Sequence, residues 1–85
     1  MKIVIVSAVW CPSCLVMNKM WKKFKEENPN IQVDKYDYDL DEDIVNQYNI
    51  GKTLPVTIFI DETGNEVNRI EGETTYEEVI KNINN

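Results

Sequence analysis

The sequence contains no histidine and only two cysteines, and both shortages limit the chemistry that the chain can carry out. A structural zinc site needs four ligands, which are usually thiolates and imidazoles. One chain offers two thiols and no imidazole, so a zinc site would require a dimer that pools two cysteine pairs, or carboxylates that complete the shell. The absence of histidine also means that a reactive thiol must be activated by something other than an imidazole base.

Positive charge is scarce as well. Nine Lys and Arg residues stand against fifteen Asp and Glu residues, which leaves a formal net charge of -6. Nucleic acids and anionic membranes are bound through basic surfaces, so we expect neither of them as a partner. The acidic balance is explained most simply by solubility.

No apolar run approaches the length of a membrane-spanning helix. The longest one, from Ile3 to Trp10, follows Lys2 and superficially resembles a short signal peptide. Cleavage near Ala8 would remove the most strand-like segment of the chain, and no flexible linker follows it. We therefore expect a buried strand at this position and a cytoplasmic protein.

The length of 85 residues and the hydrophobic fraction of 42% are typical of one globular domain, which we expect to span residues 1–85. The β-branched run from Ile3 to Val6 predicts a strand covered on both faces. After Cys14 the apolar residues follow a helical period, and residues 28–30 are expected to end this helix. The helical stripe consists of Met17, Met20, Trp21 and Phe24.

The middle of the chain predicts a polar strand and a second helix. Ile31 to Tyr38 is the strand, and its polarity favours an edge of the sheet. Asp39, with Glu42 three residues later, matches a capping box that would begin the helix, and Gly51 is expected to end it. The apolar face of this helix is formed by Ile44, Val45 and Tyr48.

The last third of the chain predicts a hairpin and a final helix. Pro55 precedes a third strand at residues 56–60, and a turn at residues 61–65 leads to a fourth strand, Glu66 to Ile70. Thr74 and Glu77 form another capping pattern before a stripe of Tyr76, Val79, Ile80 and Ile83. The expected order is β-α-β-α-β-β-α. This α/β order predicts a four-stranded mixed sheet with helices on both faces, in which crossovers join parallel strands and the hairpin adds an antiparallel edge.

Cys11 and Cys14 allow three chemical interpretations. A structural disulfide would close a very small ring and constrain the unfolded chain by only about 2 kcal/mol. A metal site would lack ligands, as described above. Thiol–disulfide exchange explains the spacing best, because Cys11 falls at the end of the first strand and Cys14 in the first turn of the following helix. Pro12 suits the first helical position, where its missing N–H costs nothing.

The expected helix start also divides the work between the two thiols. Unpaired N–H groups and the positive end of the helix dipole favour a thiolate at Cys11. Cys14 lies one turn further in, where we expect it to be more buried. It is close enough to attack a bond formed at Cys11.

The stretch from Trp10 to Cys14 resembles the Trp-Cys-x-x-Cys active site of the thioredoxin superfamily. Leu54-Pro55 is similar to the cis-proline site of that superfamily, and Gly72 resembles the glycine before its last helix. Tyr48-Asn49-Ile50, followed by Leu54-Pro55-Val56, resembles its Tyr-Gly-Ile and Pro-Thr stretch. The resemblance covers nearly the whole chain, starting from the first strand of the minimal core.

This resemblance implies a thioredoxin fold and a monomeric enzyme that reduces protein disulfides without a cofactor. Cys11 would attack the substrate, Cys14 would resolve the mixed disulfide, and a reductase or another thiol donor would recycle the pair. Trp10, Pro12 and Ser13 would support the active site. Substrate contacts would come from Trp10, Leu54, Pro55 and Gly72, with the cis bond turning the backbone of Leu54 towards Cys11 so that an extended segment can pair with it.

Three positions depart from the thioredoxin pattern. Ile5 stands where thioredoxins have a buried aspartate that assists proton transfer from the inner cysteine. Lys35 falls where thioredoxins often carry a lysine beneath the site, and we expect it to be an exposed edge-strand residue. Proline directly after the first cysteine resembles glutaredoxins instead.

Two rivals therefore accompany the thioredoxin-like reductase. A glutathione-linked enzyme is less favoured, because Glu71 and Glu73 on either side of Gly72 would repel the carboxylates of glutathione. The rival from another class is a redox sensor or metal-handling module that has the thioredoxin fold without enzymatic turnover.

Overall fold

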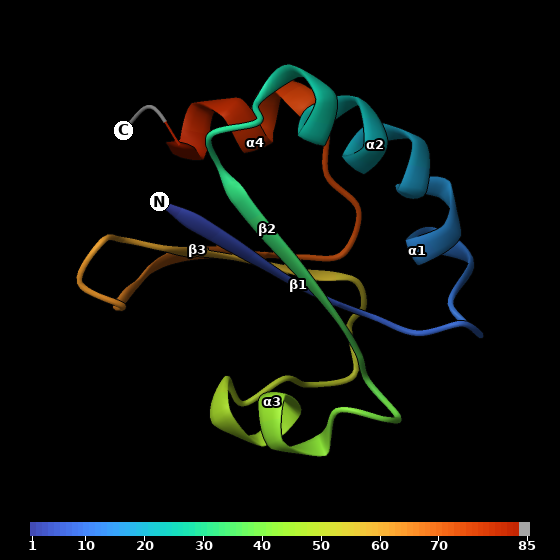
Figure 1. Cartoon of the computed structure of the whole chain (residues 1–85). Helices are drawn as coiled ribbons and strands as arrows, with labels where there is room; N and C mark the ends of the chain where they lie inside the picture. Colours follow the sequence, from blue (N-terminus) through green and yellow to red (C-terminus); the bar gives the residue numbers. More distant parts are fainter. Residues whose placement is uncertain (84–85) are drawn as a thin grey trace.

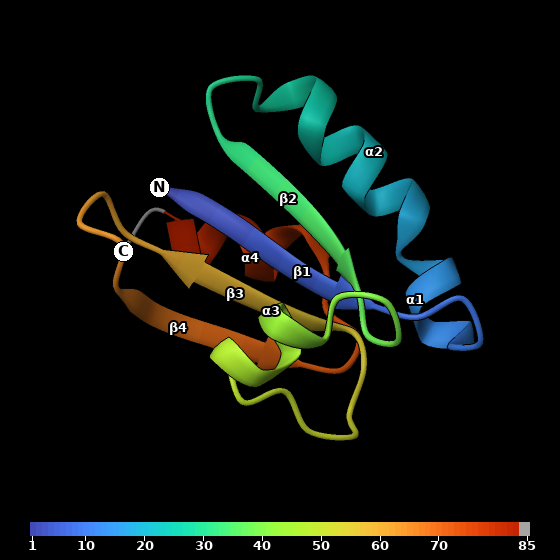
Figure 2. The same cartoon turned by 60° about the horizontal axis from the view of Figure 1, so that its bottom comes forward.

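The computed structural model describes residues 1–83, in which four strands form one mixed sheet with the order β2-β1-β3-β4. Figure 2 shows the four strands side by side. β1 (Lys2–Ser7) pairs in parallel with β2 (Gln32–Asp37), and β3 (Val56–Ile60) pairs antiparallel with both β1 and β4 (Glu66–Glu71). The β-branched runs thus become the two central strands, and the polar strand lies at an edge as expected.

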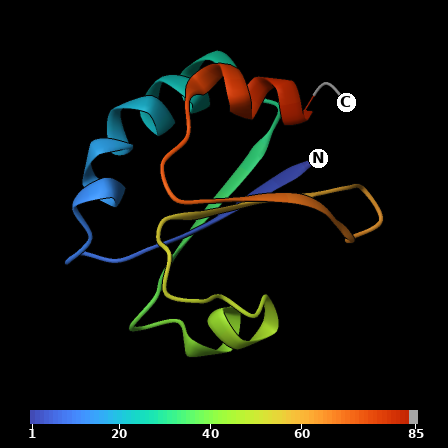
Figure 3. The same ribbon diagram turned by 180° about the vertical axis from the view of Figure 1, so that it is seen from behind.

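The helices cover both faces of this sheet. α1 (Pro12–Val16), α2 (Asn18–Glu27) and α4 (Tyr76–Ile83) lie on one face, and the short α3 (Glu42–Gln47) lies alone on the other (Figures 1 and 3). No helix within residues 1–83 is long and apolar enough to cross a membrane. The predicted order of elements and the mixed sheet are confirmed.

The sheet divides the hydrophobic core into two clusters. Phe24 and Phe59 are fully buried in the cluster beneath α2 and α4, together with Val79 from the apolar stripe of α4. The cluster on the α3 side contains both cysteines, and it is partly covered by half-buried side chains of α3 and the tyrosines that precede it. The alternation of side chains along each strand produces this division.

Two features of the strands and the first helix differ from the expectation. Antiparallel pairing is not confined to the hairpin, because β3 also runs antiparallel to β1. The expected first helix is interrupted at Met17, so that α1 and α2 are separate. Met17 keeps a right-handed helical backbone (φ -80°, ψ -8°), and its side chain is buried in the same cluster as Trp21 and Phe24. The apolar stripe therefore continues across the break.

The capping box predicted at Asp39 and Glu42 is wrong. α3 begins at Glu42 itself, with Asp41 at the N-cap position and without a capping side-chain hydrogen bond. The residues before it form a turn held by their own carboxylates: Asp37 accepts the backbone N–H of Asp39 at 2.8 Å, and Asp41 accepts that of Asp37 at 2.8 Å. This turn occupies the residues that the pattern assigned to the helix start, which leaves the carboxylate of Asp39 available for Trp10.

Two helix boundaries also move. α3 ends at Gln47 rather than near Gly51, and Asn49 adopts the left-handed conformation (φ 52°) that asparagine tolerates after a helix. At α4 the capping residue is Thr75 instead of Thr74, because the hydroxyl of Thr75 accepts the backbone N–H of Glu78 at 3.2 Å. Adjacent threonines make this position ambiguous in the sequence.

Candidate active site

The two cysteines lie where β1 passes into α1. Cys11 is the N-cap residue of α1, with an extended backbone (φ -97°, ψ 111°), and Pro12 occupies the first helical position as expected. The sulfur of Cys11 accepts the backbone N–H of Cys14 at 3.3 Å. Cys11 therefore fills the role that a serine or aspartate side chain has at other helix starts. This N–H donor stabilises negative charge on the Cys11 sulfur.

Both thiols are free and buried, with 6% of Cys11 and 5% of Cys14 exposed. The expected difference in burial is absent, because the loop that contains Leu54 covers Cys11 from the other side. Burial, together with the hydrogen bond and the charge of the neighbouring Cys11 sulfur, raises the pKa of Cys14 to about 11. The backbone of Ala8 and the ammonium group of Lys35 act in the opposite direction. Cys14 is thus a protonated thiol at neutral pH.

This difference can be measured by alkylation of the reduced protein with iodoacetamide. At pH 8, a thiol with a pKa of about 11 is ionised in only about one molecule in a thousand, and only the thiolate reacts. We expect Cys11 to be modified first and Cys14 slowly, with the rate at Cys14 rising about tenfold per pH unit as pH increases towards 11. Peptide mass spectrometry at several time points would resolve the two sites. Equal rates at Cys11 and Cys14 would contradict the assigned roles.

The loop before β3 lies directly against Cys11. The bond between Leu54 and Pro55 is cis, the isomer that the resemblance implies. The thiol of Cys11 donates a hydrogen bond to the carbonyl oxygen of Leu54 at 3.7 Å. Leu54 is itself buried, with 8% of the residue exposed.

Gly72 joins this arrangement from the far end of β4. Its backbone N–H donates to the carbonyl of Pro55 at 2.8 Å. Its φ of +92° is a conformation that side chains other than glycine rarely adopt. Gly72, which is distant in the sequence, is thereby attached to the Leu54-Pro55 loop beside Cys11.

Trp10 is 58% exposed next to the first cysteine, and it is fixed by two contacts. Its indole N–H donates to the carboxylate of Asp39 at 2.6 Å. Its ring stands edge-on against Tyr38, with the ring centroids 6.3 Å apart. Sequence reasoning missed Asp39 as part of the site, although one signal was available: β1 and β2 are parallel, so their carboxyl ends meet at one edge of the sheet.

Pro12 and Ser13, the two residues between the cysteines, form the first turn of α1. Pro12 is exposed, and Ser13 is half-buried with its backbone carbonyl accepting the N–H of Met17 at 3.3 Å. Within residues 1–83, no three cysteine, aspartate or glutamate side chains form a group that could hold a metal ion.

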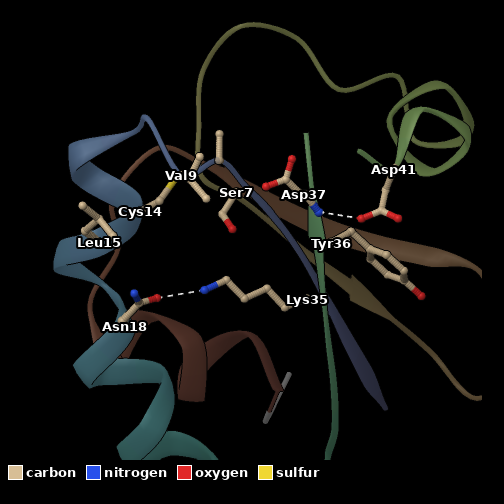
Figure 4. A pocket seen from close by; sticks show the side chains of 10 residues that line it. Ser7, Val9, Cys14, Leu15, Asn18, Lys35, Tyr36, Asp37 and Asp41 are labelled. Atoms are coloured by element: carbon tan, nitrogen blue, oxygen red, sulfur yellow. Dashed lines mark hydrogen bonds between the residues drawn. The ribbon is translucent and has the colours of Figure 1, made fainter. Parts of the chain in front are cut away.

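A cavity of about 350 Å³ adjoins Cys14 (Figure 4). Lys35 lies on its wall and donates to the side-chain oxygen of Asn18 at 2.9 Å. The expectation of an exposed edge-strand lysine is confirmed. In addition, Lys35 reaches from β2 to the start of α2 and acts on Cys14 through its charge. Its partner in the strand register is Ile5, which is buried in the core.

Comparisons with known proteins agree with this geometry. Residues 1–80 match the model of a protein family described as thioredoxin. The thioredoxin of Fasciola hepatica superimposes with a TM-score of 0.87 at 25% identity, covering 98% of this chain and 77% of that chain. The reduced thioredoxin pre-protein of Schistosoma mansoni gives a TM-score of 0.86 at 26% identity, with coverages of 98% and 75%.

A third structure, mitochondrial thioredoxin 3 of Saccharomyces cerevisiae in its oxidised form, shares the fold at 22% identity. Its TM-score is 0.86, and the match covers 98% of this chain and 76% of that chain. No curated protein matches the sequence significantly.

Proposed function

The chain belongs to the thioredoxin family, and from this premise we propose that it reduces protein disulfides through the Cys11–Cys14 pair. One observation carries the proposal. The sulfur of Cys11 accepts the N–H of Cys14 at 3.3 Å and lies 3.7 Å from the carbonyl oxygen of Leu54. A stabilised nucleophile thus adjoins a stretch of backbone that can pair with an extended substrate.

In the first step, the Cys11 thiolate attacks one sulfur of the substrate disulfide. A new bond forms between Cys11 and that sulfur, the substrate disulfide breaks, and the second substrate sulfur leaves as a thiolate. The N–H of Cys14 holds the negative charge of Cys11 before the attack. The backbone of Leu54, freed from the Cys11 thiol, becomes available to the substrate segment.

In the second step, Cys14 loses its proton and attacks Cys11 in the mixed disulfide. Two of the causes that raise the pKa of Cys14 are the hydrogen bond and the charge of Cys11. Both weaken when Cys11 becomes a neutral disulfide sulfur, while the opposing effects of Ala8 and Lys35 remain. Capture of a substrate therefore lowers the pKa of Cys14. The products are the reduced substrate and a Cys11–Cys14 disulfide, which a reductase or another thiol must reduce again.

Reduction of insulin tests this proposal. The protein, supplied with dithiothreitol, should precipitate the insulin B chain faster than dithiothreitol alone and should turn over many times. Stoichiometric zinc uptake without turnover would instead support a redox sensor or metal-handling module. A requirement for glutathione and glutathione reductase would instead support the glutathione-linked alternative. The exposed Glu71 and Glu73 beside Gly72 argue against that alternative, because they would repel the carboxylates of glutathione.

The proposal includes a cellular setting. A dithiol that must return to its reduced state suits the cytoplasm, where thiols are kept reduced. We expect residues 1–85 to act as a single domain and as a monomer. Its partners would be proteins that contain disulfides and a recycling reductase or thiol donor.

A further inference from the structure

Charged side chains are distributed unevenly around the candidate site. Four segments surround Cys11, and we call them together the rim: residues 8–13, 38–43, 51–55 and 71–74. The rim contains six acidic residues and one basic residue. Four of the nine basic residues of the chain lie on α2 instead, outside the rim. The rim is therefore more negative than the net charge of the chain alone would require, because the basic residues are concentrated elsewhere.

Specific contacts hold these segments around Cys11. Trp10 is bound to Asp39 at 2.6 Å, so the turn that precedes α3 adjoins the residue before Cys11. The Cys11–Leu54 contact at 3.7 Å brings in residues 51–55. The hydrogen bond from Gly72 to Pro55 at 2.8 Å attaches residues 71–74 to that loop. Acidic residues thus flank the cysteine and the backbone of Leu54 from two directions.

In the part of the chain that the structure describes, the carboxylates of the rim take part in no salt bridge. Within residues 1–83, the one ion pair joins Arg69 to Glu66 on β4, outside the rim. Asp39 and Asp41 accept hydrogen bonds only from uncharged N–H groups. The other acidic residues of the rim are exposed: Glu42, Asp43, Glu71 and Glu73. Arg69 interacts electrostatically with Glu71, but within the described residues no lysine or arginine forms a salt bridge with this group. The one cation of the rim, the exposed Lys52, is outnumbered.

The rim also exposes apolar surface. Leu40 is 84% exposed between the acidic residues of the turn before α3, and Val9 is 80% exposed next to Trp10. Together with Trp10, which is 58% exposed, they offer apolar contacts to a segment that binds at Cys11. A partner that fits this mixture presents apolar residues together with positive charge.

Building on the proposed function, we infer that the preferred substrates are proteins whose disulfide lies in an extended, cationic segment with lysine or arginine near the reacting cysteine. The negative rim attracts such a segment during encounter and repels acidic ones. The chemistry of the exchange is unchanged. Charge therefore selects which disulfide reaches Cys11.

Two peptides of identical length test this inference. Each contains one cysteine, activated as a mixed disulfide with 2-thiopyridine, and the cysteine is flanked by lysines in one peptide and by glutamates in the other. The release of 2-thiopyridone reports attack by the reduced protein. We expect the cationic peptide to react about tenfold faster at low salt, and the ratio to approach one at high salt.

A matched pair of variants separates the rim from the total charge. Glu71→Gln with Glu73→Gln removes two charges from the rim, whereas Glu26→Gln with Glu62→Gln removes two exposed charges from the end of α2 and the hairpin turn. Figure 1 shows the hairpin turn at the opposite side of the molecule from α1, and the end of α2 at the far end of that helix from α1. The rim variant should reduce the ratio of the rates with the cationic and the acidic peptide by roughly threefold or more. The distant variant should retain the ratio of the parent protein.

Lys52→Gln provides a test of opposite sign, because it should increase the preference for the cationic peptide. Equal rates with both peptides in the parent protein would overturn the inference and leave the proposed function intact. So would equal effects of the rim and distant variants. If neither peptide reacts, the proposed function itself fails, and the inference fails with it.

Discussion

Replacement of Cys11 with serine is expected to reduce insulin reduction to the rate of the added thiol alone. A serine hydroxyl stays protonated at neutral pH and is a poor nucleophile towards sulfur. The N–H of Cys14, which stabilises charge on the Cys11 sulfur at 3.3 Å, would then face a neutral oxygen. The buried Cys14 is a poor substitute, because burial, the largest cause of its raised pKa, is unchanged in the variant and favours the protonated thiol.

Cys14→Ser is the matched variant, with the same change of atom three residues later. Cys11 still attacks, but nothing within the protein resolves the mixed disulfide. In the parent, Cys14 does so quickly because the helix start holds the two sulfurs at high effective concentration. The variant should therefore accumulate covalent complexes with its partners.

These complexes are read on a non-reducing gel of a cell lysate and should disappear when a reductant is added. Mass spectrometry of the trapped proteins would identify the substrates. Trapping by Cys11→Ser alone would reverse the assignment of the two cysteines. Absence of trapped partners, in combination with an inactive parent, would favour the sensor or metal-handling alternative.

Phe24→Ala should have the largest effect on stability. Phe24 is fully buried, and its ring packs against Trp21 and Tyr76 with centroid distances of 5.6 and 5.9 Å. It thereby links α2, the sheet and the region where α4 begins. Removing a buried phenylalanine costs about 3–5 kcal/mol, which is a large part of the roughly 5–15 kcal/mol that stabilises a whole domain.

Urea denaturation followed by circular dichroism measures this loss as a shift of the midpoint to lower urea. Leu40→Ala is the control, because Leu40 is 84% exposed and its truncation should change the free energy of unfolding by no more than about 0.5 kcal/mol. If the two variants unfold at the same urea concentration, Phe24 does not hold the layers together.

The sequence predicted those parts of the fold that depend on burial. The runs that became β1 and β3 are apolar because both strands are central, and β2 is polar because it lies at an edge. The cysteine pair was equally predictable, since its spacing, together with Pro12, has few structural interpretations. The apolar runs and the cysteine spacing are patterns of neighbouring residues, so they can be interpreted without knowledge of tertiary contacts.

The missed features depend on contacts between distant segments. Asp39 matched a capping box, but the indole of Trp10, 29 residues earlier, binds its carboxylate. Lys35 was expected to be an ordinary surface lysine, and only the packing of α2 against β2 shows that Asn18 holds its ammonium group near Cys14. The equal burial of the two cysteines likewise depends on the loop at Leu54, which local patterns do not place.

Because Cys11 is the N-cap residue of α1, the redox state of the Cys11–Cys14 pair affects the stability of the fold. When the pair is oxidised, the Cys11 sulfur can no longer hold a negative charge against the N–H of Cys14, so the two redox states do not anchor α1 equally well. By thermodynamic linkage, the difference between their free energies of unfolding is proportional, through ΔG = −nFΔE for two electrons, to the difference in reduction potential between the folded pair and the same two cysteines in an unfolded chain. Denaturation curves of the two redox forms therefore measure how much the fold shifts the reduction potential of the cysteine pair. Whichever form unfolds at the higher urea concentration reveals whether the fold makes this dithiol a better electron donor or a better acceptor.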